Sequence, residues 1–233
     1  IDKPISVFST FSFLPRIESI RSGIFEMAKI DDIYSAKILY RSLIEHWVKF
    51  QFLLLKTFDA KDDVVGIDYW FFGQGQENLD FTKSLKSIRS FLNINDDKLP
   101  IDELKDLGAI PKKLSGSKIQ SRLEQFKYKN MTNYLIDNYS KTSKKSEMNW
   151  FLEVFPRFSL LSSYVHGGPD SIRSEDPLND TFEVIVNTAT VASLSTRQFT
   201  FILLYQYDRK FGELVNLARE FTERHQQYNN ASQ

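Results

Sequence analysis

The sequence predicts an all-α fold, and three observations support this prediction. Apolar residues recur at the three- and four-residue spacing of a helix along most of the chain. Glycine and proline, which most often interrupt helices, are scarce, with 9 and 7 copies among 233 residues. No segment has an evident partner strand. We therefore expect residues 1–233 to form a single helical-bundle domain of about six or seven main helices, joined mostly by polar loops.

The bulk composition excludes several classes of protein. The chain is 42% hydrophobic and 26% charged, which is typical of a globular domain. Its 30 basic and 30 acidic residues leave no net charge to attract nucleic acid or an anionic membrane. The absence of cysteine excludes a disulfide framework, a thiolate zinc site and a cysteine nucleophile. No apolar stretch reaches the roughly 18 residues of a membrane span, and no signal peptide is evident, so we expect a cytoplasmic protein without a membrane partner.

The first third of the chain is predicted to hold two helices. Residues 1–15 are expected to be an N-terminal extension, and a helix is expected over 16–29. A long helix over 33–58 follows, with apolar residues at i, i+3, i+4 and i+7. Asp31 and Asp32 supply its N-cap and a negative first turn.

The middle of the chain alternates between turn residues and helical patterns. After a polar break at 59–66, the WFFGQG motif (residues 70–75) is expected to form a turn with aromatic anchors or a patch that faces a partner. A helix is expected over 77–93. Residues 93–117 form an internal loop region with one short helical turn, and residues 117–139 are again helical.

The last third is predicted to hold two long helices and a terminal segment. One helix starts at Ser146, with Pro156 as a kink or restart. Another begins at Asp180 or Thr181 and ends near Tyr207. Its β-branched stretch over 181–194 is also compatible with a strand, but the helical stripe favours a helix. An amphipathic segment follows at 209–227, and 226–233 is a polar tail.

The helix that starts at Ser146 ends in the motif SSYVHGGPD, residues 162–170. His166 lies in the last turn, where free carbonyls favour a cation, Gly167 can adopt the left-handed cap conformation and Pro169 stops the helix. Capping alone therefore accounts for the motif. The small polar residues before His166 also let a ligand approach closely, so the motif is equally a candidate site.

Arg41 and Glu45 lie one helical turn apart on a face that is apolar above and below them. Buried charges need partners, and these two residues can pair with each other. Two interpretations stay open: a structural Arg–Glu pair beside a capping histidine, or a functional cleft formed by the same residues.

Two blocks of the chain resemble a known family. The first begins ILYRSLIEHW and covers residues 38–55, and the second contains SSYVHGG and covers 160–168. Together they resemble the HEPN-like helical domains of bacterial proteins. Many HEPN proteins are toxin or antiphage ribonucleases and others are non-catalytic, so the resemblance implies a possible effector in phage defence or stress response.

The catalytic hypothesis gives each residue a role and needs neither a metal nor a cofactor. His166 acts as the acid–base group on a ribose 2′-OH, Arg41 clamps the phosphate, and Glu45 orients either of them. The expected substrate-binding residues include Ser162, Ser163 and Tyr164. A symmetric homodimer would bring two copies of this region together.

The chain departs from the catalytic HEPN pattern, in which an arginine closely precedes the histidine on one helix. Here the nearest upstream arginine, Arg157, has eight residues between it and His166. Arg41 would have to supply the cation from another helix. The alternative function is therefore a non-catalytic helical module that binds a partner protein or a nucleotide.

A basic segment extends the candidate RNA surface. Nine Lys or Arg residues lie between Pro111 and Ser146, against two acidic residues, with aromatic residues interleaved. Such a segment can hold a nucleic-acid backbone and stack bases, or it can be a solvated helix face. The basic residues assigned to substrate binding are Lys112, Lys113, Arg122 and Lys127.

His46 does not predict a metal site. The adjacent Glu45 invites that interpretation, but position 50 is Phe where a second ligand would lie one turn on. His225 falls in the polar C-terminal tail.

Overall fold

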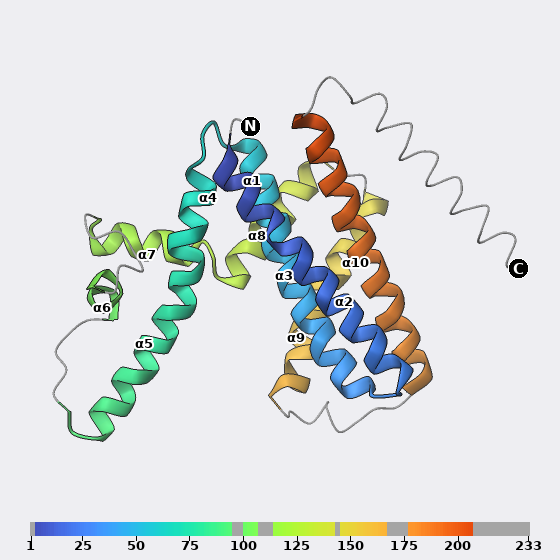
Figure 1. Ribbon diagram of the computed structural model, residues 1–233, viewed down its shortest axis with the longest axis horizontal. Helices are drawn as coiled ribbons and strands as arrows, with labels where there is room; N and C mark the ends of the chain where they lie inside the picture. Colours follow the sequence, from blue (N-terminus) through green and yellow to red (C-terminus); the bar gives the residue numbers. More distant parts are fainter. Residues whose placement is uncertain (1–2, 95–99, 107–113, 143–144, 167–176, 207–233) are drawn as a thin grey trace, which may run out of the picture.

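A computed structural model describes residues 3–94, 100–106, 114–142, 145–166 and 177–206. Every regular element within these ranges is helical, so the predicted all-α fold is confirmed. Figure 1 shows a bundle formed by α1, α2, α3, α8, α9 and α10, and an arm formed by α5, α6 and α7 at its side. The β-branched stretch 181–194 belongs to a helix, so the strand alternative is wrong.

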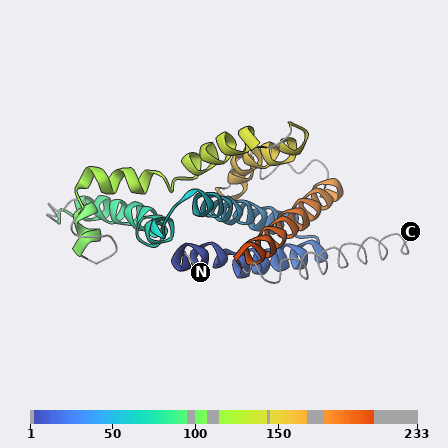
Figure 2. The same cartoon turned by 90° about the horizontal axis from the view of Figure 1, so that it is seen from above.

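Helix α3 (Ile33–Asp59) is the central element of the bundle. Figure 2 shows α3 between a layer that contains α1 and α2 and a layer that contains α8 and α9. Its sequence fits this central place, because α3 carries apolar side chains on several of its sides along most of its length. Leu43, Trp47 and Phe50 are all 1% exposed or less. The predicted N-cap is confirmed: the side chain of Asp32 accepts a hydrogen bond from the backbone N–H of Ser35 at 3.0 Å.

Residues 4–11, within the segment that was expected to be an N-terminal extension over 1–15, form a helix of the bundle. Helix α1 (Pro4–Phe11) begins at a proline, and α2 (Phe13–Lys29) follows almost at once. The carboxylate of Asp63 accepts hydrogen bonds from the backbone N–H groups of Ile5, at 2.8 Å, and Ser6, at 2.6 Å. This capping from a distant residue has no local sequence signal.

The arm begins with a helix where a turn was expected. Helix α4 (Val64–Asp68) continues through a π-helical turn, η1 (Tyr69–Gly73), into α5 (Gln74–Phe91). Gly66 permits this path, because a side chain at position 66 would come within 2.3 Å of the backbone nitrogen of Ser6. The WFFGQG motif therefore lies inside one continuous helical path.

The helix boundaries between residues 100 and 142 differ from the predicted ones. Helix α6 (Pro100–Asp106) lies inside the expected loop region, and the helix expected over 117–139 is two helices, α7 (Gly116–Glu124) and α8 (Tyr128–Thr142). The break places Phe126 in the core at 7% exposure. The side-chain amide of Asn130 donates to the carbonyl of Glu124 at 2.7 Å, which satisfies the end of α7.

The last two described helices both pack on α3, and an ion pair between Arg157 and Glu183 joins them to each other. Helix α9 (Lys145–Val165) passes through Pro156 without a restart, and α10 (Pro177–Gln206) begins slightly earlier than expected. The amide side chains of Gln51 on α3 and Gln198 on α10 bond to each other, and Tyr139 on α8 donates to Gln51 at 2.8 Å. The expected segments 209–227 and 226–233 lie outside the described residues.

Candidate functional site

The contact between α3 and α9 brings together the two sequence blocks that carry the candidate site. The Nε of Arg41 donates a hydrogen bond to the Oγ of Ser162 at 3.2 Å, across 121 positions of sequence. The guanidinium carbon of Arg41 also lies 4.5 Å from the centre of the Phe158 ring. Ser162 and Phe158 are one turn apart on α9, so this helix fixes Arg41 through a hydrogen bond and a cation–π contact.

Glu45 and Lys49 complete a row of alternating charge on α3. An Nη of Arg41 lies 3.3 Å from a carboxylate oxygen of Glu45, and the Nζ of Lys49 lies 3.1 Å from the other oxygen. The three side chains are 19–30% exposed. Two cations therefore share one carboxylate at a partly open surface.

Tyr128 of α8 lies beneath this row. Its ring stacks on Phe158, with centroids 3.7 Å apart and an angle of 17° between the planes. Its buried hydroxyl has no hydrogen-bond partner among the described residues. Burial raises the pKa of Tyr128, and the carboxylate of Glu45 raises it further against a lowering effect of Arg41. The hydroxyl is therefore a neutral donor without an acceptor, close to the charged row.

His166 follows the last residue of α9 and is exposed. Its backbone N–H donates to the carbonyl of Ser162 at 3.1 Å, so the helical hydrogen-bond pattern reaches His166. The same serine is the residue that contacts Arg41. The structure thus joins Arg41, Glu45 and Ser162 directly and places the histidine one turn beyond them.

Tyr164, which was expected to bind substrate, is a buried side chain with a structural contact. It is 8% exposed, and its hydroxyl accepts a hydrogen bond from the Nζ of Lys37 at 3.0 Å. Lys37 also forms an ion pair with Asp180 of α10. Burial alone would lower the pKa of Lys37, but its bonds to Asp180 and Tyr164 outweigh burial and raise it. Tyr164 therefore ties α3, α9 and α10 together.

Replacing Lys37 with methionine is expected to lower the free energy of unfolding by about 1 to 3 kcal/mol, because Tyr164 and Asp180 lose their donor. A raised lysine pKa contributes stability below its usual value of 10.5 and loses it only at higher pH. The loss should therefore be constant between about pH 6 and 9 in urea denaturation. Lys129→Met, at an exposed lysine of α8, is the matched control; an equal loss there would contradict the role of Lys37.

The basic segment does not form an aromatic stacking surface over the residues that the structure describes. Arg122 forms an ion pair with Asp68 at 2.6 Å, and Lys127 pairs with Glu124 at 2.6 Å. The interleaved aromatic side chains pack inward: Phe126 and Tyr128 contact other rings, and Tyr134 and Tyr139 bond to Asp59 and Gln51. Lys112, Lys113 and the side chain of Ser163 lie outside the described residues.

The described residues contain neither a cluster of metal ligands nor a membrane-spanning helix. No group of three or more His, Asp or Glu side chains that could hold a metal ion occurs in the part of the chain that the structure describes. His46 instead places its Nδ1 2.8 Å from the carbonyl of Ser42. Among the described helices, none has the length and apolar character needed to cross a bilayer.

Sequence reasoning missed three residues of the site: Lys49, Tyr128 and Phe158. A signal existed for Lys49, which follows Glu45 by one helical turn and extends the Arg41–Glu45 row. A weaker signal existed for Phe158, which precedes Ser162 by one turn. Tyr128 had none, because its place depends on the break between α7 and α8.

Comparison with known proteins yields one match. A family model described as a family of unknown function, DUF5677, matches residues 9–180. No curated protein and no solved structure matches the chain. The matched residues include Arg41, Glu45, Ser162 and His166, so the whole candidate site lies inside the matched range.

Proposed function

The chain belongs to DUF5677, a family of unknown function, and on that premise we propose that it is a metal-independent endoribonuclease of the HEPN type. The proposed site comprises His166 as the acid–base group and Arg41 as the phosphate clamp. Glu45 and Ser162 hold Arg41 in place. RNA is the proposed partner, and the cytoplasm is the proposed location.

One observation carries this proposal: the residue that holds Arg41 lies one helical turn before His166. Ser162 accepts from Arg41 through its side chain and from His166 through its backbone carbonyl. An arginine fork suits a phosphate, and an exposed imidazole suits proton transfer. Ser162 therefore connects both groups, and this connection supports a phosphodiester site.

The ion pair that Arg157 forms supports Arg41 as the cation that clamps the phosphate. Arg157 is the closest arginine before His166 on the same helix, but it forms an ion pair with Glu183 of α10. Its charge is therefore directed at a neighbouring helix. Arg41 instead lies beside Ser162, one turn before His166, and shares Glu45 with Lys49.

The proposed chemistry is an internal transfer of the phosphate. The imidazole of His166 removes the proton from a ribose 2′-OH, and the 2′-oxygen forms a bond to phosphorus. The bond from phosphorus to the 5′-oxygen breaks, and the leaving oxygen takes a proton from the imidazolium of His166, which returns to the neutral imidazole. Arg41 stabilises the charge that develops on the phosphate oxygens. The products are a 2′,3′-cyclic phosphate and a 5′-hydroxyl.

The first test is to incubate the purified chain with structured RNAs and tRNA in the presence of a chelator. We expect cleavage that leaves 2′,3′-cyclic phosphate ends, because no step uses a metal. Arg41→Lys should retain more activity than Arg41→Ala, since lysine keeps the charge but loses the fork. Intact RNA with a folded parent chain would refute the nuclease proposal.

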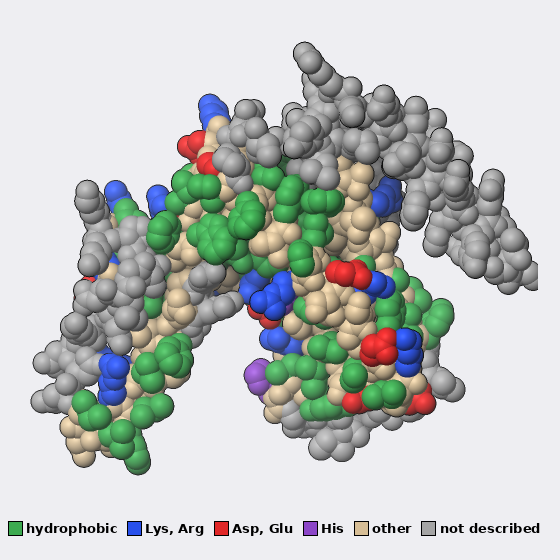
Figure 3. All heavy atoms as spheres, in the orientation of Figure 1, with side chains coloured by type: hydrophobic (Ala, Val, Ile, Leu, Met, Phe, Trp, Pro, Cys, Tyr) green, Lys and Arg blue, Asp and Glu red, His purple; other side chains and the backbone are tan. Residues whose placement is uncertain are grey.

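A specific observation favours the alternative function, a module that binds a partner protein. Several large apolar residues are exposed on α1, α4 and η1, and Figure 3 shows hydrophobic side chains gathered there. Phe8 is 61% exposed and lies parallel to Trp70, which is 41% exposed. The backbone N–H groups of Ile5 and Ser6 donate to Asp63, which ties the start of α1 to the residue before α4. Retention of a partner on this patch, lost in Phe8→Ser, would support the module.

A further inference from the structure

The outward face of α2 carries four residues in a regular row: Glu18, Ser22, Phe25 and Lys29. Their spacing of four, three and four residues places them on one side of the helix, opposite the buried Ile24. The side chain of Glu18 at one end of the row is 58% exposed, and that of Lys29 at the other end is 67% exposed. We call this row the α2 outer stripe. Along the helix, the stripe consists of an acidic, a small, an aromatic and a basic side chain.

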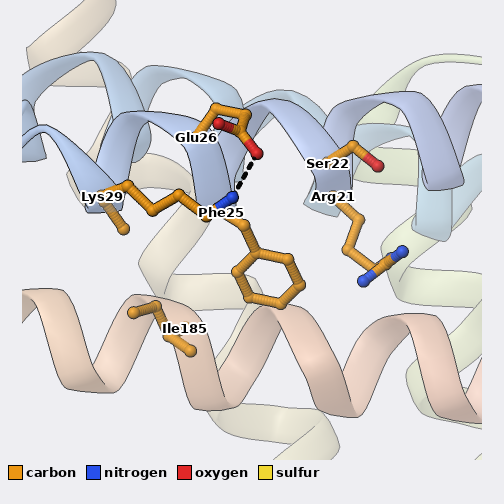
Figure 4. A pocket seen from close by; sticks show the side chains of 7 residues that line it. Arg21, Ser22, Phe25, Glu26, Lys29 and Ile185 are labelled. Carbon is orange, nitrogen blue, oxygen red and sulfur yellow. Dashed lines mark hydrogen bonds and ion pairs between the residues drawn. The ribbon is translucent and has the colours of Figure 1, made fainter.

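A groove lies beside the middle of this stripe, between α2 and α10. Its volume is about 520 Å³, and its walls include Ser22, Phe25 and Ile185. Figure 4 shows Phe25 extending from α2 toward α10 above Ile185, with the Glu26–Lys29 ion pair at one side. The neighbouring apolar residues of α10 are open to solvent: Phe182 is 68% exposed and Val186 is 44% exposed.

We propose that the α2 outer stripe and this groove bind a second copy of the chain, with the two α2 helices antiparallel across a two-fold axis. An axis midway between residues 23 and 24 places Glu18 opposite Lys29 of the second copy, at both ends of the contact. The same axis places Phe25 opposite Ser22 of the second copy. The aromatic ring thus meets a small residue at the mouth of the groove, where an anchor side chain can be buried.

The charge pattern selects the second copy as the occupant. A two-fold interface must be complementary to itself, and the stripe meets this condition because its two ends carry opposite charges at equal distances from the centre. A parallel arrangement would set Glu18 against Glu18 and Lys29 against Lys29, which is unfavourable. The pairs within α2, Glu18 with Arg21 and Glu26 with Lys29, are exposed and contribute little on their own.

This inference concerns a surface away from the proposed nuclease residues and holds whether or not the chain cleaves RNA. It is a different arrangement from the expected homodimer that brings two copies of the His166 region together. Sedimentation of the full chain over a concentration series tests it first. We expect the mass to rise from that of one chain, 27.2 kDa, toward twice that value. A mass that remains that of one chain across the series would overturn the proposal.

Exchanging the charges at positions 18 and 29 then tests the antiparallel arrangement of the two α2 helices. Glu18→Lys and Lys29→Glu should each raise the dimer Kd by about tenfold, because each change affects two symmetric contacts. The double variant Glu18→Lys, Lys29→Glu restores opposite charges across the axis and should return the Kd to that of the parent. Equal weakening in the double variant would overturn the antiparallel arrangement.

The control for this series is Lys129→Glu, which reverses an exposed charge on α8 and should leave the Kd unchanged. A mixture of Glu18→Lys and Lys29→Glu chains gives a second readout. In the mixed pair each of the two contacts across the axis joins one lysine and one glutamate, so mixing should restore the dimer that each variant alone has lost. Failure of the mixture to dimerise more tightly than either variant alone would contradict the proposed axis.

Discussion

Replacing His166 with alanine is expected to reduce RNA cleavage by a factor of about 10² to 10⁴, the usual contribution of a positioned acid–base group. The side chain is exposed, and the backbone N–H that continues the helical pattern is retained by alanine. The free energy of unfolding should therefore change little. Single-turnover cleavage with excess enzyme measures the rate, and urea denaturation measures the stability.

His46→Ala is the control, because it removes a histidine of the same chain from a different contact. His46 lies against Ser42 and Phe13 within the α2–α3 region, so its loss should leave the cleavage rate of the folded chain unchanged. Imidazole added to His166→Ala should recover part of the activity. If His166→Ala cleaves at the parental rate, the acid–base role is wrong, whatever the source of the nuclease activity.

The predicted helices were accurate where a local signal marks them. Helix α3 begins at the residue after Asp32, because a carboxylate at that position can accept a hydrogen bond from the first turn. The apolar spacing of residues 33–58 then requires neighbours on several sides, and α3 is indeed the most enclosed helix of the bundle. Local chemistry and burial agree there, so the sequence pattern is unambiguous.

The errors in the fold have one physical cause, which is dependence on distant contacts. Helix α1 is stabilised at its start by Asp63, and Gly66 allows the backbone of α1 to approach closely. The π-helical turn at Tyr69–Gly73 replaces an expected turn for the same reason, since its aromatic residues pack on other helices. Neither feature follows from the residues beside it.

In the candidate site, too, some contacts follow from local sequence and others depend on distant contacts. The pairing of Arg41 with Glu45 follows from their spacing on one helix, and the structure contains it. The bond from Arg41 to Ser162 depends on how α9 packs on α3, and no local pattern specifies it. The inward turn of Tyr164 depends likewise on Lys37, a buried lysine whose partner Asp180 belongs to a third helix.

Replacing Trp47 with alanine is expected to lower the free energy of unfolding by about 3 to 5 kcal/mol, the largest stability effect that we predict. The side chain is 1% exposed and belongs to the hydrophobic core. It lies about halfway along α3, the helix between the layer that contains α1 and α2 and the layer that contains α8 and α9. Its removal leaves a cavity that helices packed on several sides cannot easily close.

Trp70→Ala is the matched control, since it removes the same side chain from the surface of η1, where Trp70 is 41% exposed. Its cost should be well below that of Trp47→Ala in urea denaturation of both variants. Trp47→Phe should recover part of the loss, because it restores much of the aromatic volume. Equal losses for the two tryptophans would contradict a core centred on α3. The site would then lack the rigid helix that holds Arg41 against Ser162.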